Sequence, residues 1–186
     1  MNDFFLVNNE SLSYTFIDQN IQVMQIQIKN LNKFAYYAEP FKALESYSIE
    51  AIKSIIDECI VQIMGLCSMV TTLDLNDFAT HVEDHNAIAE LVLKIIEVNG
   101  AYFKKEETER RQNDRDKSPW FDSFQYLVSA GHRPDDILNM SYGAFIEYMK
   151  SAQRLNNRKL RSFTTAIRVA QHAKQKDFEK FVSNFD

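Results

Sequence analysis

Residues 48–70 read SIEAIKSIIDECIVQIMGLCSMV, and this stretch decides the fold class. Apolar side chains recur in it every three or four residues, the spacing that gathers them on one face of an α-helix. The residues on that face are Ile52, Ile55, Ile56, Cys59, Ile60, Ile63, Met64 and Cys67. Ser48 stands at the N-cap position, where its hydroxyl can accept a hydrogen bond from the first turn. The stretch therefore predicts one long amphipathic helix that ends at Thr71–Thr72.

Helices are also predicted on both sides of this stretch. Asn30 is placed to cap a short helix that Pro40 interrupts, and residues 74–82 form another short helix. Asp84 caps a long helix that is apolar on nearly two faces, which places it in the middle of a domain. Its apolar residues are Ile88, Leu91, Val92, Ile95, Ile96, Tyr102 and Phe103. Only four glycines and three prolines occur in 186 residues, too few for an all-β domain, so the chain is expected to be mainly α.

The first 29 residues are predicted to form strands. Ile21 and Val23 alternate with polar residues, and the alternation slips by one position before Met24, which indicates a bulge. Residues 14–16 are the expected hairpin partner, across a turn at residues 18–20. A sheet of two or three strands is not stable alone, so we expect this small N-terminal hairpin to lie on the helices.

A charged segment divides the sequence into two predicted modules. Residues 110–117 contain no apolar side chain, which is typical of a linker or a solvated helical extension. We therefore expect an α+β module at residues 1–109 and a helical module at residues 118–186. Residues 1–117 contain 11 Lys and Arg against 19 Asp and Glu, whereas residues 118–186 contain 10 against 7. This change of charge at the linker is what two modules would show.

The second module is predicted to contain three helices and an aromatic tail. Ser118 and Pro119 begin the first helix, and Gly131 ends it. A short helix follows from Arg133, and Ser141 caps a long third helix with apolar residues at gaps of three to five.

Several functional classes are disfavoured by what the sequence lacks. It contains no phosphate-binding glycine loop, no GxSxG and no HExxH, so we expect neither an enzyme nor a cofactor. No apolar run approaches the roughly 18–20 residues that a membrane span needs, and the N-terminus does not resemble an export signal.

A metal site is the weaker interpretation of the histidines and cysteines. His81 and His85 are one helical turn apart, and Cys59 or Cys67 could complete a tetrahedral zinc site. The two cysteines lack CxxC spacing and lie about 12 Å apart along a helix, too far for a disulfide. We therefore favour the interpretation that the histidines are solvated at the start of a helix and that the two cysteines are buried free thiols.

The basic C-terminal stretch is the feature that could bind nucleic acid. Its residues are Arg154, Arg158, Lys159, Arg161, Arg168, Lys174 and Lys176. A net charge of +3 over residues 118–186 is small for a module that must neutralise several phosphates. The short helix that would read bases carries Ile137, Leu138 and Met140, which are typical of a core. A solvated basic face is therefore favoured, and nucleic acid is not the expected partner.

The motifs of the second module resemble those of a known family. They are Trp120, Phe124-x-Tyr126-Leu127, Gly131, the acidic short helix ending in residues 137–141, and Phe145 at the start of a long helix. This pattern is similar to the C-terminal part of phage tail assembly chaperones. The first module resembles their N-terminal part in its opening β segment, its Leu75, Asp77 and Phe78 step, and a helix ending in Glu97-Val98-Asn99.

The resemblance implies a non-enzymatic chaperone of long-tailed phages that acts in the host cytoplasm and is absent from the mature virion. In that family the N-terminal part coats the tape measure protein and keeps its long helices from aggregating. The C-terminal part recruits tail tube subunits and in many phages is added by a ribosomal frameshift. The expected partners are therefore the tape measure protein and the tail tube protein, while homo-oligomer formation stays open.

Aromatic residues of the second module are the predicted partner-binding site, because large aromatics dominate the energetics of interfaces. They are Trp120, Phe121, Phe124, Tyr126, Phe145, Phe178, Phe181 and Phe185. Two other functions stay open, a structural tail or baseplate component and a nucleic-acid-binding regulator.

Overall fold

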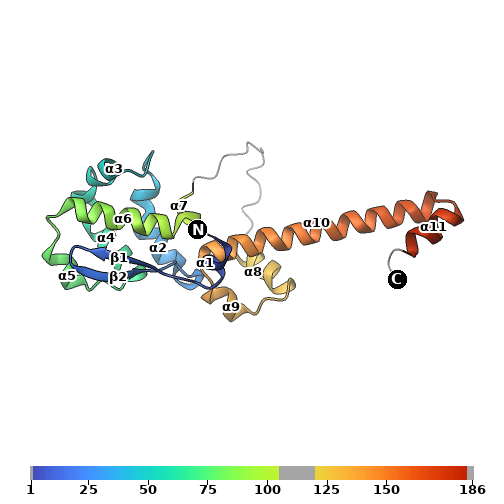
Figure 1. The fold of residues 1–186 in the computed structure, drawn as a ribbon, viewed down its shortest axis with the longest axis horizontal. Helices are drawn as coiled ribbons and strands as arrows, with labels where there is room; N and C mark the ends of the chain where they lie inside the picture. The colour runs from blue at the N-terminus through green and yellow to red at the C-terminus, as the bar shows by residue number, and fades with distance from the viewer. Residues whose placement is uncertain (1, 105–119, 184–186) are drawn as a thin grey trace. The chain divides into compact units, whose positions relative to one another are not determined.

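The computed structural model describes residues 2–104 and 120–183. It is mainly α with one two-stranded antiparallel sheet near the N-terminus, as the sequence predicts (Figure 1). The chain divides into two compact units, which we call unit 1 (Met1–Glu147) and unit 2 (Tyr148–Asp186). Each unit is described separately below.

Unit 1 opens with a short helix and the predicted hairpin. Helix α1 (Asp3–Val7) begins where the Asn2 side chain accepts a hydrogen bond from Phe5 N at 2.8 Å. Strands β1 (Leu12–Phe16) and β2 (Gln19–Val23) pair in antiparallel register. The prediction that the first 29 residues are all strands is wrong at α1 and after Val23. Residues 24–27 leave the hairpin because their backbone bonds to other parts of unit 1 instead.

The described residues of unit 1 form eight further helices (Figure 1). They are α2 (Leu31–Lys42), which follows a 3-10 turn η1 (Ile28–Asn30), α3 (Ile49–Lys53), α4 (Ile56–Val70), α5 (Leu75–Thr80), α6 (His85–Val98), α7 (Gly100–Phe103), α8 (Trp120–Ser129) and α9 (Pro134–Asn139). Helix α4 packs against α2 and α6, α3 packs against α6, and α6 packs on both strands of the hairpin. The largest fully buried side chains are Phe16, Phe34, Phe41, Phe78, Phe103, Ile52, Ile56, Ile63, Leu66, Ile88, Leu91 and Ile95.

Three predicted helices have different limits in the structure. The helix capped by Asp84 ends at Val98, so Tyr102 and Phe103 lie on the separate helix α7. Ser48 does cap a helix, with its Oγ accepting from Ala51 N, but that helix ends at Lys53 and α4 starts at Ile56. The predicted single helix is therefore broken, and Cys59 also departs from helical φ and ψ within α4. Pro40 does not interrupt α2, which continues for two residues beyond it. A proline this near the end of the helix removes one backbone hydrogen bond while the buried Phe41 still anchors the last turn.

A buried asparagine joins the hairpin side of unit 1 to α6. Asn99 is 5% exposed, and its Oδ1 accepts from Ile26 N at 2.7 Å. Its Nδ2 donates to Met24 O at 3.2 Å and to Ile95 O at 3.0 Å. The segment from Met24 to Gln27 is thus held by a side chain rather than by a third strand.

The same segment ties α9 and the start of α10 to unit 1. Helix α10 runs from Tyr142 to His172, and Ser141 Oγ accepts from Ala144 N at its start, as predicted. Ile28 N donates to Met140 O at 3.1 Å, and Tyr142 N donates to Ile26 O at 2.8 Å.

The division of the fold therefore lies further along the chain than the charged segment. Unit 1 extends through Glu147, so α8, α9 and the first turn of α10 belong to it, whereas the sequence assigned them to the second module. The predicted linker at residues 110–117 lies outside the described residues.

Unit 2 consists of the rest of α10 and helix α11 (Gln175–Val182). No side chain that the structure describes in this unit, from Tyr148 to Phe181 and at Ser183, is buried. Helix α10 is mostly solvent-facing over more than twenty residues, which is unusual for a sequence that contains large apolar side chains.

Candidate protein-binding surfaces

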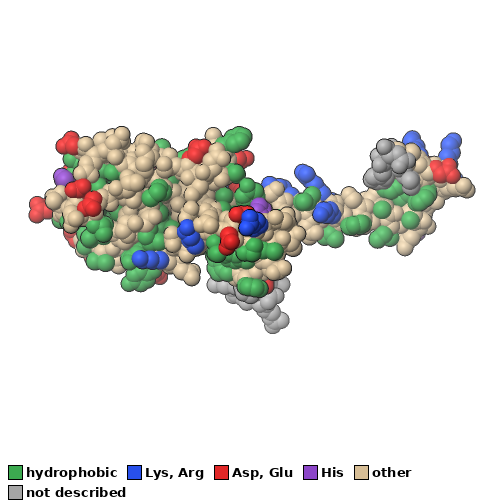
Figure 2. Space-filling view, turned by 90° about the horizontal axis from the view of Figure 1, so that it is seen from below, with side chains coloured by type: hydrophobic (Ala, Val, Ile, Leu, Met, Phe, Trp, Pro, Cys, Tyr) green, Lys and Arg blue, Asp and Glu red, His purple; other side chains and the backbone are tan. Residues whose placement is uncertain are grey.

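An apolar stripe runs along the exposed part of α10. It consists of Leu155, Leu160, Phe163 and Ile167, which are 52%, 56%, 66% and 58% exposed. At 100° per residue these four side chains fall within an arc of about 140°. Figure 2 shows hydrophobic side chains lying open at the surface of this helix. A contiguous exposed apolar patch marks an interaction site more often than scattered exposed residues do.

The opposite side of α10 is basic. Lys150, Arg154, Arg158, Arg161 and Arg168 lie on this basic face, centred roughly 160° from the centre of the apolar stripe. Lys159 is the exception, because it falls within the arc of the stripe. The helix is thus apolar on one side and cationic on the other.

The two units carry opposite net charges. Unit 2 contains nine Lys and Arg against three Asp and Glu, a formal charge of +6. Unit 1 contains 12 against 23, a formal charge of −11. The contrast is sharper than the −8 and +3 that a division at residue 117 gives, because α8, α9 and Glu147 add acidic residues to unit 1.

The predicted aromatic site divides between the two units. In unit 1, Trp120 is 49% and Phe121 76% exposed, while Phe124 and Tyr126 are half-buried. Phe145 is buried, and its ring lies 5.7 Å from that of Trp120 and 5.9 Å from that of Phe124. Phe145 therefore closes a small aromatic cluster between α8 and α10 and offers little surface to a partner.

In unit 2 the predicted aromatics lie on α11. Phe178 is 42% exposed and Phe181 is half-buried, whereas Phe185 lies outside the described residues. Sequence reasoning did not assign the apolar stripe of α10 to the site. Its spacing was visible, but a helical apolar repeat is ordinarily covered by another helix, and only the structure shows that no described segment buries this one.

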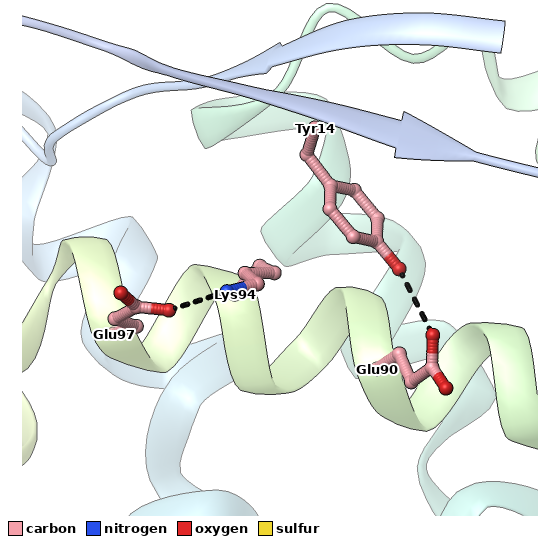
Figure 3. A network of polar contacts seen from close by, with 4 residues as sticks. All are labelled: Tyr14, Glu90, Lys94 and Glu97. Atoms are coloured by element: carbon pink, nitrogen blue, oxygen red, sulfur yellow. Dashed lines mark hydrogen bonds and ion pairs between the residues drawn. The ribbon is translucent and has the colours of Figure 1, made fainter.

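Unit 1 has an open groove beside α6, which we call the α6 groove. It has a volume of about 530 Å³ and is lined by Tyr14, Tyr47, Ile49, Glu90, Leu93, Lys94, Ile96 and Glu97. Its lining is mostly apolar, and Figure 3 shows its charged residues Glu90, Lys94 and Glu97 on α6. Such a groove can take the apolar face of an amphipathic helix.

The charged side chains that line the α6 groove are two carboxylates and one ammonium group. Tyr14 Oη donates to Glu90 Oε2 at 3.5 Å, and Lys94 Nζ pairs with Glu97 Oε2 at 2.8 Å (Figure 3). Burial raises the pKa of Tyr14, and the nearby Glu90 charge raises it further, so the phenol stays protonated and can donate. No Lys or Arg among the described residues pairs with Glu90.

The two histidines contact different polar groups, and the two cysteines are free thiols. His81 Nδ1 lies 2.8 Å from Thr80 Oγ1 and 2.9 Å from Asp77 O, whereas His85 Nε2 lies 3.3 Å from Asp57 Oδ1. Within residues 2–104 and 120–183, no three His, Cys, Asp or Glu side chains are grouped to hold a metal ion. Cys67 is a buried free thiol whose pKa is raised by burial to about 12, so it is a poor nucleophile.

Comparison with known proteins adds no relative. No protein-family model, no curated protein and no solved structure matches this chain. Across the described part of the chain, no helix has the length and apolar character needed to cross a membrane.

Proposed function

We propose that this protein is a phage tail assembly chaperone, which binds the tape measure protein and recruits tail tube subunits without catalysing a reaction. The observation that carries this proposal is the apolar stripe on α10. Helices in proteins gain most of their stability from tertiary packing of an apolar face, and no described segment buries this one. A partner that covers the stripe would supply the missing stabilisation.

The two units offer two different surfaces for two partners. The α6 groove of unit 1 suits the apolar face of a long amphipathic helix, which is the chemistry of a tape measure protein. The apolar stripe and Phe178 in unit 2 provide the surface for tail tube subunits. Exposed Trp120 and Phe121 extend the apolar surface of unit 1.

A second candidate function is nucleic-acid binding, and the basic face of α10 favours it. A net charge of +6 on unit 2 supports several phosphate contacts. This function would leave the apolar stripe unused, so the chaperone proposal accounts for more of the surface.

The test is co-expression with the tail tube and tape measure proteins that this proposal requires in the same genome. Phe163→Glu places a charge in the middle of the stripe, at a side chain that is already 66% exposed, so folding should be unaffected. We expect tube capture to fall at least tenfold while the tape measure protein stays in solution. Thr165→Glu puts the same charge on the other side of α10 and should capture tube protein normally.

Two outcomes would count against the chaperone proposal. Equal capture of tube protein by the Phe163→Glu and unaltered chains would remove the stripe from its site. Salt-sensitive retention on DNA that Arg154→Gln and Arg158→Gln abolish, without any capture of tail proteins, would favour the second candidate instead.

A further inference from the structure

The apolar stripe and the α6 groove are complementary to each other as well as to outside partners. The stripe is apolar and belongs to a unit of net positive charge, and the groove is mostly apolar and belongs to a unit of net negative charge. We propose that the apolar stripe of one copy of this chain docks in the α6 groove of a second copy. This self-association does not depend on the identity of the partners proposed above.

The anchor spacing fits a helix lying in a groove. Leu160, Phe163 and Ile167 stand at positions i, i+3 and i+7, the pattern by which an amphipathic helix inserts its apolar face. Together they span an arc of about 60°, narrower than the whole stripe. A groove of about 530 Å³ with the half-buried Leu93 and Tyr47 in its lining offers an apolar surface for such anchors.

Two arginines of the basic face have the same spacing along their helix as the two glutamates of the groove. Glu90 and Glu97 are seven residues apart on α6, which places them about 10.5 Å apart along its axis. Arg161 and Arg168 are also seven residues apart, and both lie on one side of the anchors. The two arginines lie about 110–130° from the centre of the anchors, and Glu97 already pairs with Lys94, so these charges favour the docking through the field of the basic face rather than through fixed pairs.

The long-range electrostatics favour this pairing over a stripe-to-stripe dimer. Docking unit 2 of one copy on unit 1 of another brings a charge of +6 to a charge of −11. Stripe-to-stripe pairing would instead bring two units of +6 together. Opposite charges speed the encounter and disfavour the like-charged arrangement, and both effects weaken with added salt.

Different surfaces meet in this contact, so it is heterologous. A heterologous contact forms rings or open chains rather than a closed two-fold pair, and each copy can both donate its stripe and accept another. In this contact the apolar stripe and the α6 groove would cover each other until another partner displaces one of them.

The test measures the mass of the full chain by sedimentation velocity over a concentration series. We expect mass to rise with concentration and the association to weaken at least tenfold between about 50 mM and 500 mM salt. Phe163→Glu should be monomeric, because its stripe is damaged while its groove is intact. The double variant Glu90→Lys/Glu97→Lys should also be monomeric, because its groove is damaged while its stripe is intact.

Mixing the two monomeric variants gives the decisive result. One intact groove and one intact stripe remain, so we expect a 1:1 dimer that does not grow further. A mixture that stays monomeric would overturn the proposal, and so would an unaltered chain that is monomeric at every concentration. Undiminished association of the Glu90→Lys/Glu97→Lys variant would show stripe-to-stripe pairing instead.

Two controls separate a lost contact from a lost fold. Ser151→Glu should associate like the unaltered chain, because it adds the same charge at an exposed position nine residues before the first anchor. Arg161→Glu/Arg168→Glu lowers the charge of unit 2 from +6 to about +2 and should weaken the association at 50 mM salt more than at 500 mM salt. Undiminished association of this variant at low salt would contradict the contribution of long-range charge.

Discussion

Replacing Asn99 by alanine should lower the free energy of unfolding of unit 1 by more than the loss of an exposed asparagine side chain would. Its side chain meets three backbone groups, Ile26 N at 2.7 Å, Met24 O at 3.2 Å and Ile95 O at 3.0 Å. In Asn99→Ala the first two lose the partner that the side chain provides. Ile95 O keeps the hydrogen bond from Asn99 N at 3.0 Å, so it adds little to the cost.

The size of the effect follows from burial. A buried backbone group without a hydrogen bond costs about 1–3 kcal/mol, and here there are two, one of them only part-buried. The expected loss in the free energy of unfolding is therefore about 2–5 kcal/mol. Typical domains are stable by only about 5–15 kcal/mol, so the variant should lie near the limit of folding.

The measurement is urea unfolding of the full chain, followed by circular dichroism at the helix band. Asn139→Ala is the matched control, because its exposed side chain bonds to Lys29 Nζ and Asp135 O where water can replace it. We expect the control to stay within about 0.5 kcal/mol of the unaltered chain. An Asn99→Ala loss no larger than the Asn139→Ala loss would refute the assignment of Asn99 as the link between α6 and residues 24–27.

Three further predictions concern the core of unit 1. Ile56→Asp should cost several kcal/mol in the free energy of unfolding, because it buries an unpaired charge at a side chain that is 1% exposed; retained helicity in a thermal melt would contradict this. Gly65→Ala should cost about 1–3 kcal/mol in chemical denaturation, because its Cβ would overlap the Tyr37 ring, whereas Gly100→Ala meets no atom within 4 Å and should be nearly neutral. Burial raises the pKa of Cys67 from 9.0 to about 12, so the thiol ionises at lower pH in the unfolded chain than in the folded one. The free energy of unfolding therefore falls as the pH rises between these two pKa values, by up to about 1.4 kcal/mol per pH unit. Cys67→Ala should remove this part of the slope in unfolding curves measured between pH 8 and pH 11, roughly the range over which the unfolded thiol titrates; an unchanged slope would rule it out.

Three helix starts were predictable from the sequence because capping is local, whereas the predicted cap Asn30 makes no side-chain hydrogen bond at the start of α2. Ser48, Asp84 and Ser141 each accept a hydrogen bond from a backbone N–H three residues later. Such a bond depends on four consecutive residues, so it can be inferred without knowing the rest of the fold. The mainly helical class and the N-terminal hairpin followed from periodicity for the same reason.

Long-range bonds explain where the prediction was wrong. Residues 24–27 have the alternation of a strand, yet Asn99 and Tyr142 hold their backbone from more than 70 residues away. The sequence contains both ends of these bonds but nothing that brings them together. The extension of unit 1 through Glu147 has the same origin.

Charge and exposure differ in the same way: the sequence determines the charge, and only the tertiary structure determines which apolar residues are exposed. Composition alone determined that the chain is acidic overall and basic toward its C-terminus, since charge needs only a count. Phe145 and Phe163 both lie at helical spacing on α10, yet one is 2% and the other 66% exposed. Periodicity assigns a side chain to a face of its helix, but whether that face is covered depends on another segment of the chain. Only the tertiary structure shows that α8 covers Phe145 and that no described segment buries Phe163.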